Sequence, residues 1–154
     1  MSKTCCFTGH REIPLLRLPQ LKKSLLETIE EQIKLGYCYF GAGGALGFDT
    51  LAAQAVLKLK ETYPHIRLIL VLPCLSQTRG WREKDVAEYE RIKSLADKVV
   101  YTSQEYSRGC MFKRNRHLVD NSSICIAYLS KDEGGTAYTV KYAQEKGVKV
   151  INLA

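Results

Sequence analysis

Four glycines within seven residues make the stretch from Gly41 to Asp49 the first candidate for chemistry. A short apolar run precedes it and a helical pattern follows it, so a strand, a turn and a helix start are predicted here. Glycine lets backbone N–H groups lie against a ligand, and a helix N-terminus favours negative charge. Gly43, Gly44 and Gly47 are therefore candidate anion-binding residues; the alternative is a tight turn that needs glycine for geometry alone. The spacing matches neither the dinucleotide pattern G-x-G-x-x-G nor a P-loop.

A second strand–glycine–helix junction occurs where Gly134 and Gly135 precede Thr136. The Thr136 hydroxyl could donate to a phosphate or cap the helix. Two such turns on neighbouring strands would place two anion cradles side by side, which suits a nucleotide or its ribose phosphate. Asp49, at the start of the first of these helices, is either a cap or dipole partner, or an acceptor for ribose hydroxyls.

Two nearby arginines form a candidate phosphate clamp. Arg114 and Arg116 flank Asn115, and guanidinium groups make bidentate, charge-assisted hydrogen bonds to phosphate. The alternative is a solvated helix face on which Arg116 pairs with Asp120, four residues later.

The loop after the first predicted strand contributes Gly9, His10 and Arg11 to the same positive field. His10 could act as a general acid or base, although no neighbouring carboxylate is placed to orient it. Trp81, the only tryptophan, could stack a base together with Tyr89 on the next predicted helix. A core or hinge position explains Trp81 equally well.

Hydrolytic chemistry has weaker support in the sequence. An activated water or nucleophile needs a carboxylate or histidine close to the reacting carbon. The residues from Ala137 to Val140 include no acid, and Asp132 and Glu133 are expected on the strand side of the turn. No catalytic residue is assigned, and the sequence leaves open whether the protein is an enzyme.

The elements that must position these residues alternate between strand and helix. Strands are predicted at residues 3–7, 37–40, 66–72, 97–101, 123–129 and 148–153. Helices are predicted at residues 20–35, 49–61, 83–95 and 134–146. This alternation predicts a single α/β domain over residues 1–154, a Rossmann-like three-layer sandwich with a mostly parallel sheet of about six strands. Ligands bind such sheets at the carboxyl ends of the strands, where the candidate residues gather.

Composition narrows the class of partner. The formal net charge of +7, from 23 basic and 16 acidic residues, favours an anionic partner such as a nucleotide or a nucleic acid. The longest apolar run, around residues 68–72, is too short to cross a bilayer, and no signal peptide is visible, so we expect a cytoplasmic protein without membrane contact. The cysteines lack C-x-x-C spacing, which favours buried thiols, and the histidines lack metal-ligand spacing, so no metal is expected.

Four motifs follow one another along the chain: Thr8-Gly-His-Arg11, Gly43-Gly-Ala-Leu-Gly-Phe-Asp49, Lys113-Arg-Asn-Arg-His-Leu-Val-Asp120 and Gly134-Gly-Thr136. With these motifs the chain resembles the SLOG superfamily, which unites the DNA-processing protein DprA (SMF) with the Lonely Guy proteins. The resemblance is closest to the small bacterial YpsA-like branch and covers nearly the whole chain. It implies a Rossmann-like sheet with a nucleotide-type site at the strand ends. It also implies these pocket residues: Gly43, Gly44, Gly47, Asp49, Arg114 and Asn115.

Departures from the superfamily pattern separate the functional hypotheses. Lonely Guy enzymes cleave the glycosidic bond of a nucleoside monophosphate with a Pro-Gly-Gly-x-Gly-Thr motif and a glutamate behind it. Here Glu133 replaces the proline, and the third glycine and that glutamate are missing. DprA-like proteins bind single-stranded DNA and are longer, with extra domains.

The first hypothesis is therefore binding of a nucleotide or nucleotide-derived ligand of the NAD or ADP-ribose type, with sensing as one use of it. The alternatives are single-stranded DNA binding through residues 114–116 and nucleotide N-glycosidic hydrolysis. A small anionic ligand is the expected partner, and no other cofactor is implied. Because superfamily relatives often form dimers, a homodimer is a further expectation.

Overall fold

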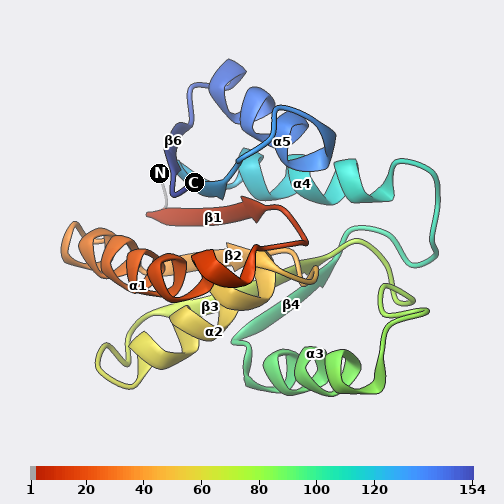
Figure 1. Ribbon diagram of the computed structural model, residues 1–154, viewed down its shortest axis with the longest axis horizontal. Helices are drawn as coiled ribbons and strands as arrows, with labels where there is room; N and C mark the ends of the chain where they lie inside the picture. Colours follow the sequence, from red (N-terminus) through yellow and green to blue (C-terminus); the bar gives the residue numbers. More distant parts are fainter. Residues whose placement is uncertain (1–2) are drawn as a thin grey trace.

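The computed structural model describes residues 3–154 and confirms the predicted α/β fold. Its described residues form one sheet of six parallel strands in the order β4-β3-β2-β1-β5-β6, with helices on both faces (Figure 1). The strands are β1 (Thr4–Gly9), β2 (Tyr39–Ala42), β3 (Arg67–Leu72), β4 (Lys98–Tyr101), β5 (Ile124–Tyr128) and β6 (Lys149–Asn152). The helices are α1 (Leu18–Lys34), α2 (Phe48–Lys60), α3 (Glu83–Leu95), α4 (Cys110–Asp120) and α5 (Gly134–Glu145), with a 3-10 turn, η1 (Leu15–Arg17), before α1.

Helices α1, α2 and α3 cover one face of the sheet, and α4 and α5 cover the other (Figure 1). The central strands β1 and β5 are buried along almost their whole length. Strands that are covered on both faces have nearly continuous apolar sequences, and β1 and β5 both show this pattern. On the α1–α3 side the core includes three phenylalanine rings, with Phe7 stacked on Phe40 at 6.3 Å and edge-on to Phe48 at 6.4 Å.

One boundary bears on the candidate site. The second strand begins at Tyr39, two residues later than predicted, and includes Gly41 and Ala42. Just before it, Cys38 N–H donates to the Lys3 carbonyl at 3.2 Å, and the Cys38 carbonyl accepts from the Arg67 N–H at 2.8 Å. The glycine turn therefore starts at Gly43, and Gly41 belongs to the sheet.

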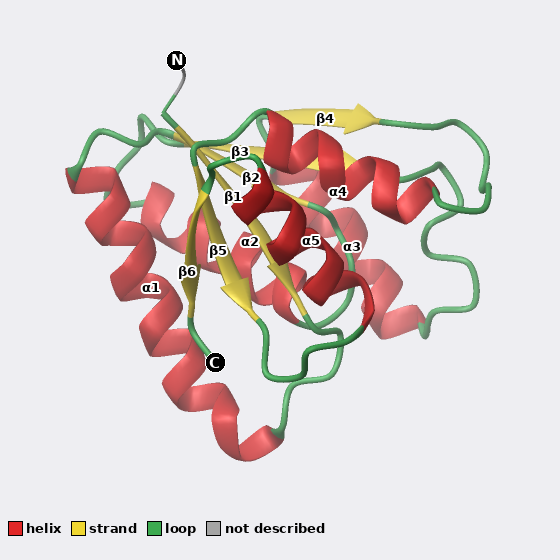
Figure 2. Ribbon diagram, turned by 90° about the horizontal axis from the view of Figure 1, so that it is seen from above, coloured by secondary structure: helices red, strands yellow, loops and turns green. Residues whose placement is uncertain are grey.

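The chain reverses its progress across the sheet at β1. Strands β1 to β4 extend the sheet to one side, and the chain then returns past β1 to add β5 and β6 on the other. The loop after β1 leads to a helix on one face, and the loop after β5 leads to a helix on the opposite face (Figure 2). Diverging loops open a crevice at such a topological switch point, at the carboxyl ends of the strands.

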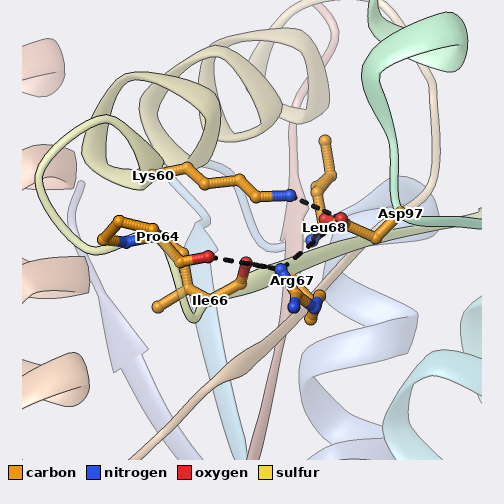
Figure 3. A network of polar contacts seen from close by, with 6 residues as sticks. All are labelled: Lys60, Pro64, Ile66, Arg67, Leu68 and Asp97. Carbon is orange, nitrogen blue, oxygen red and sulfur yellow. Dashed lines mark hydrogen bonds and ion pairs between the residues drawn. The ribbon is translucent and has the colours of Figure 1, made fainter.

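The opposite edge of the sheet, where β3 and β4 begin, carries a group of charges that we call the amino-edge cluster: Lys60, Arg67 and Asp97 (Figure 3). The Asp97 carboxylate lies 2.5 Å from Lys60 Nζ and 3.8 Å from Arg67 Nη1. It also accepts a hydrogen bond of 2.8 Å from the Leu68 N–H. These contacts join the end of α2 to the starts of two neighbouring strands.

All six cysteines are free thiols, and only Cys38 among them is not fully buried. Within residues 3–154 no helix combines the length and apolar character needed to span a bilayer. The same residues contain no group of three or more His, Cys, Asp or Glu side chains that could hold a metal ion.

Candidate functional site

A pocket of about 310 Å³ opens at the carboxyl edge of the sheet, at the switch point between β1 and β5. Four segments surround it: the end of β1 with its loop, the start of α2, the first turns of α4, and the start of α5. Its lining residues are Phe7, Thr8, Gly9, His10, Arg11, Ala45, Asp49, Met111, Phe112, Arg114, Asn115, Glu133, Gly134, Gly135 and Thr136. We call this the carboxyl-edge pocket.

Most of the residues selected from the sequence line this pocket. They are Gly9, His10, Arg11, Asp49, Arg114, Asn115, Gly134, Gly135 and Thr136. The remaining selected residues lie elsewhere, namely Gly43, Gly44, Gly47, Trp81 and Arg116. All four motifs therefore contribute residues to the pocket, the second of them through Asp49, while the glycines of that motif lie outside the lining.

Gly43 is required by a close approach of buried side chains. A Cβ at this position would lie 2.5 Å from Arg114 Nη1 and 2.9 Å from Asp49 Oδ2. The Gly43 carbonyl oxygen accepts hydrogen bonds from Arg114 Nη1 and, at 3.1 Å, from Gln77 Nε2. Gln77, which no motif in the sequence singles out, is itself held by a 3.1 Å hydrogen bond from the Tyr89 hydroxyl. These contacts fix the turn from inside the protein.

Asp49 occupies the inner side of the same turn. Its side chain is buried, and Oδ2 accepts a 3.2 Å hydrogen bond from the Ala45 N–H. Burial raises the pKa of Asp49, and it outweighs the opposing effects of Arg114 and of hydrogen bonds from the Ala45 and Gly43 N–H groups. The backbone donors expected to cradle a ligand anion are thus already directed at a carboxylate of the protein.

Arg114 is a buried cation rather than an exposed clamp, with 4% of its surface accessible. Burial lowers its pKa, and the negative charge of Asp49 acts in the opposite direction. Its Nε donates to Asn115 Oδ1 at 2.7 Å. Since the Asn115 oxygen is engaged in this way, its NH₂ group remains as a donor at the pocket wall.

Arg116 points away from the pocket. Its Nη1 donates to the Tyr138 hydroxyl at 3.1 Å, on the outer surface of α4 and α5. Asp120 accepts a 2.7 Å hydrogen bond from Tyr142, and no Arg116–Asp120 ion pair forms within the described residues. The three residues of the predicted clamp therefore face different surroundings, because consecutive positions on a helix lie about 100° apart.

Gly47 serves the packing of two loops. It has a φ of +78°, and a Cβ there would come within 2.1 Å of the Arg11 carbonyl oxygen. Phe48 N–H donates to the His10 carbonyl at 3.1 Å across this contact. The glycine thus lets the β1 loop lie directly on the N-terminus of α2.

Trp81 and Gly44 line a separate hollow of about 40 Å³ between α2 and α3. The Trp81 ring is edge-on to Tyr89, with ring centroids 5.5 Å apart, and packs against the main core. This arrangement matches the core alternative for Trp81.

His10 joins the β1 loop to the β5–α5 loop. Its Nε2 accepts hydrogen bonds from the Ser130 N–H at 3.1 Å and the Lys131 N–H at 3.3 Å. Partial burial and then the charge of Lys131 lower the pKa of His10, while Glu133 opposes them. An accepting Nε2 carries no proton, so His10 acts here as an acceptor that positions the turn before α5.

Two threonines of low exposure line the pocket with hydroxyls that have no hydrogen-bond partner among residues 3–154. Thr8, at the end of β1, and Thr136, in the first turn of α5, are each 7% exposed. No side chain caps the N-terminus of α5, so Thr136 does not perform the capping role considered from the sequence. Both hydroxyl oxygens remain accessible, since among the described side chains the only polar atom that is buried without a partner is Gln32 Oε1. The two hydroxyls are therefore free to bond to a ligand in the pocket.

Glu133 corrects an expectation from the sequence. It was expected on the strand side of the turn, yet it lines the pocket at the N-cap position of α5. Its backbone is extended, with φ −155° and ψ 161°, which turns the residue out of the helix. Within the described residues its carboxylate has no hydrogen bond or ion pair.

Sequence reasoning also missed the apolar wall formed by Met111 and Phe112. These residues precede Arg114 and Asn115 by three positions, so they share the pocket-facing side of α4. Phe112 is 40% exposed and packs edge-on against Tyr138 with ring centroids 4.6 Å apart. Helical spacing from the arginine motif would have identified both.

A family model, YpsA, described as the YspA SLOG family, matches residues 5–151. The prophage-derived protein YoqJ of Bacillus subtilis is 32% identical over 139 residues, which cover 82% of this chain and 81% of YoqJ. A UPF0398 protein of Brevibacillus brevis is 30% identical over 129 residues, covering 82% of this chain and 66% of that protein.

Among solved structures, DNA processing protein A from Helicobacter pylori, described for its single-stranded DNA binding mode, has a TM-score of 0.70 at 18% identity. The match covers 97% of this chain and 64% of that one. DprA from Streptococcus pneumoniae gives a TM-score of 0.69 at 18% identity, and this chain spans about half of its length, 49%. These likenesses show a shared fold.

Proposed function

This chain belongs to the YpsA family of SLOG proteins, and we propose that it binds a nucleotide or nucleotide-derived ligand, of the NAD or ADP-ribose type, in the carboxyl-edge pocket. The observation that carries the proposal is the pair of unpartnered hydroxyls of Thr8 and Thr136, on either side of the switch point. They face a pocket whose other free groups are mainly donors.

The phosphate of such a ligand belongs at the N-terminus of α5. Backbone N–H groups of the first turn have no partner within a helix, and the helix dipole favours an anion there. Gly134 and Gly135 carry no side chain that would block the approach, and nothing lies within 4 Å of a Cβ built on either. Arg11 is exposed at the pocket, and its guanidinium makes no hydrogen bond or ion pair within residues 3–154, so it is available for phosphate.

The rest of the nucleotide can be placed along α4. The Asn115 amide offers donors, and the accessible Phe112 ring offers a stacking surface for a base. A volume of about 310 Å³ lies at the lower end of the range of roughly 300–1,000 Å³ for small-molecule sites. One nucleotide unit is therefore the part of the ligand that the pocket encloses.

The test is thermal unfolding of the protein with AMP, ADP-ribose, NAD and a short single-stranded DNA. A ligand at 100 times its dissociation constant should raise the free energy of unfolding by about 2.7 kcal/mol. Thr136→Val, which keeps the shape but removes the hydroxyl, should weaken the affinity for the ligand about tenfold and thereby reduce this stabilisation. Thr28, 8% exposed in α1 and outside the pocket, provides the matched Thr28→Val control. Stabilisation by none of the nucleotides would refute the proposal.

A second candidate, single-stranded nucleic acid, is favoured by a row of aromatic rings on the surface of α4 and α5. Phe112 meets Tyr138, and Tyr138 stacks near Tyr142 with centroids 6.4 Å apart. Arg116 bonds to Tyr138, and Lys146 lies 5.5 Å above the Tyr142 ring. Rings beside cations are the elements of sequence-independent single-strand binding. DNA affinity that falls steeply with salt and drops in Tyr138→Ala would support this candidate.

A further inference from the structure

The two carboxylates of the carboxyl-edge pocket differ in what they can still bind. Asp49 is 7% exposed and already accepts a hydrogen bond from the Ala45 N–H. Glu133 is exposed and lines the pocket, and its carboxylate makes no hydrogen bond or ion pair within residues 3–154. The sequence suggested Asp49 as an acceptor for ribose hydroxyls, but in the structure Glu133 is the carboxylate that is available for this role.

We propose that Glu133 accepts hydrogen bonds from the 2′- and 3′-hydroxyls of a ribose, so that the pocket selects ribonucleotides over 2′-deoxyribonucleotides. The inference rests on the proposed function, because it assigns the sugar of the ligand whose phosphate lies at α5. It names the ligand as a small ribosyl phosphate and disfavours DNA as occupant of this pocket.

The chemistry of the neighbouring groups supports this assignment. A carboxylate beside an anion site is unfavourable unless it meets donors, because like charges repel. The sugar hydroxyls are the donors that a nucleotide carries nearest to its 5′-phosphate. Asn115, Arg11 and the N-terminus of α5 all supply hydrogen-bond donors. The hydroxyl donors of the ligand therefore need an acceptor from another residue, and the Glu133 carboxylate provides one.

The position of Glu133 along the chain fits the same arrangement. It directly precedes Gly134 and Gly135, so phosphate and sugar would be bound by consecutive residues of one turn. That turn is held in place by His10, whose Nε2 accepts from the N–H groups of Ser130 and Lys131. A preorganised acceptor discriminates well, because an analogue that lacks the hydroxyl leaves the polar group of the site unpaired.

The experiment is calorimetric titration of AMP and 2′-deoxy-AMP into the wild-type protein, Glu133→Gln and Asp132→Asn. We expect the wild type to prefer AMP by about tenfold, the worth of one charge-assisted hydrogen bond. In Glu133→Gln this preference should fall to about twofold or less, because AMP loses more affinity than 2′-deoxy-AMP, which has only the 3′-hydroxyl to offer this acceptor. Asp132→Asn removes the same charge from the adjacent exposed position, which does not line the pocket, and should keep the wild-type ratio.

Three results would overturn the inference. Equal binding of the two nucleotides by the wild type would leave the proposed function intact and remove Glu133 as a sugar acceptor. An unchanged ratio in Glu133→Gln would have the same meaning, and so would an equal loss of the ratio in Asp132→Asn. Binding of neither nucleotide, and of neither ADP-ribose nor NAD, by folded wild-type protein would instead refute the proposed function itself.

Discussion

Two aspartates at opposite edges of the sheet have similar partners but different surroundings. Asp97, in the amino-edge cluster, has a side chain 22% exposed and meets Lys60 and Arg67 directly. Asp49, at the carboxyl edge, is buried under the glycine turn, with Arg114 as its neighbouring cation. For both, burial is the largest single influence and raises the pKa. At Asp97 the partners outweigh burial and the pKa is lowered, whereas at Asp49 burial prevails.

The difference shows how the protein divides stability and binding between its two edges. The amino-edge cluster consists of groups that satisfy one another, and at Asp97 the favourable contacts with Lys60, Leu68 and Arg67 together outweigh desolvation, so the cluster joins α2, β3 and β4. The carboxyl edge holds its buried charges beneath the surface and leaves the hydroxyls of Thr8 and Thr136 free at the pocket wall. Accessible hydroxyls without a protein partner are groups through which a ligand can gain binding energy.

The largest expected effect separates the buried arginine from its exposed neighbour. Arg114→Met should lower the free energy of unfolding by about 3 kcal/mol, because it leaves the buried Asp49 carboxylate without its neighbouring positive charge. Arg116→Met, two residues along the same helix, should change it by less than about 0.5 kcal/mol. Urea denaturation of both variants measures the difference. Equal effects would mean that the carboxyl edge is no more dependent on its charges than an ordinary surface.

An intermediate effect is expected from filling the space between the buried charges. Gly43→Ala places a Cβ 2.5 Å from Arg114 Nη1 and should cost about 2 kcal/mol, since the contact is closer than van der Waals distance. In Gly135→Ala the new Cβ meets no heavy atom within 4 Å. This variant should be as stable as the wild type or slightly more stable, because alanine favours a helix. Thermal unfolding of the two variants without ligand provides the comparison. A well-tolerated Gly43→Ala would contradict the packing described for the turn.

The smallest effect concerns the amino-edge cluster and acid. Because the pKa of Asp97 is lowered in the folded protein, its contribution to stability is complete above the unfolded pKa of about 3.9. That contribution is lost as the pH falls through the folded pKa. Asp97→Asn should therefore cost about 1 kcal/mol at neutral pH, and the difference from wild type should shrink on acidification to about pH 2. Urea denaturation across this pH range tests the sign, and a cost that grows with acid would contradict it.

The order and type of the strands and helices were predictable because they depend on local periodicity. Helix α3 forms at the predicted residues 83–95, and β5 lies within the predicted 123–129. The gathering of Arg11, Asn115 and Thr136 at one edge also followed, since parallel strands end on the same side.

The roles of individual polar groups were not predictable in the same way. Whether a guanidinium is buried depends on the Gly43 carbonyl, 71 positions away from Arg114. The direction of Arg116 depends on Tyr138 in another helix, and the accessibility of Glu133 depends on how the turn before α5 docks onto His10. None of these contacts leaves a periodic signal in the chain.

The sequence by itself thus determined the three-layer α/β fold and the edge of the sheet at which polar residues collect, because alternating periodicities and glycine punctuation act over a few residues. The tertiary structure alone decided which polar groups form hydrogen bonds inside the protein and which remain available to a ligand. Asp49 and Arg114 form hydrogen bonds with backbone groups of the glycine turn, while the side chains of Thr8, Thr136 and Glu133 have no protein partner at the pocket, among the described residues. That division depends on hydrogen bonds and burial between segments far apart in the chain, which form only when the sheet and both helical layers have come together.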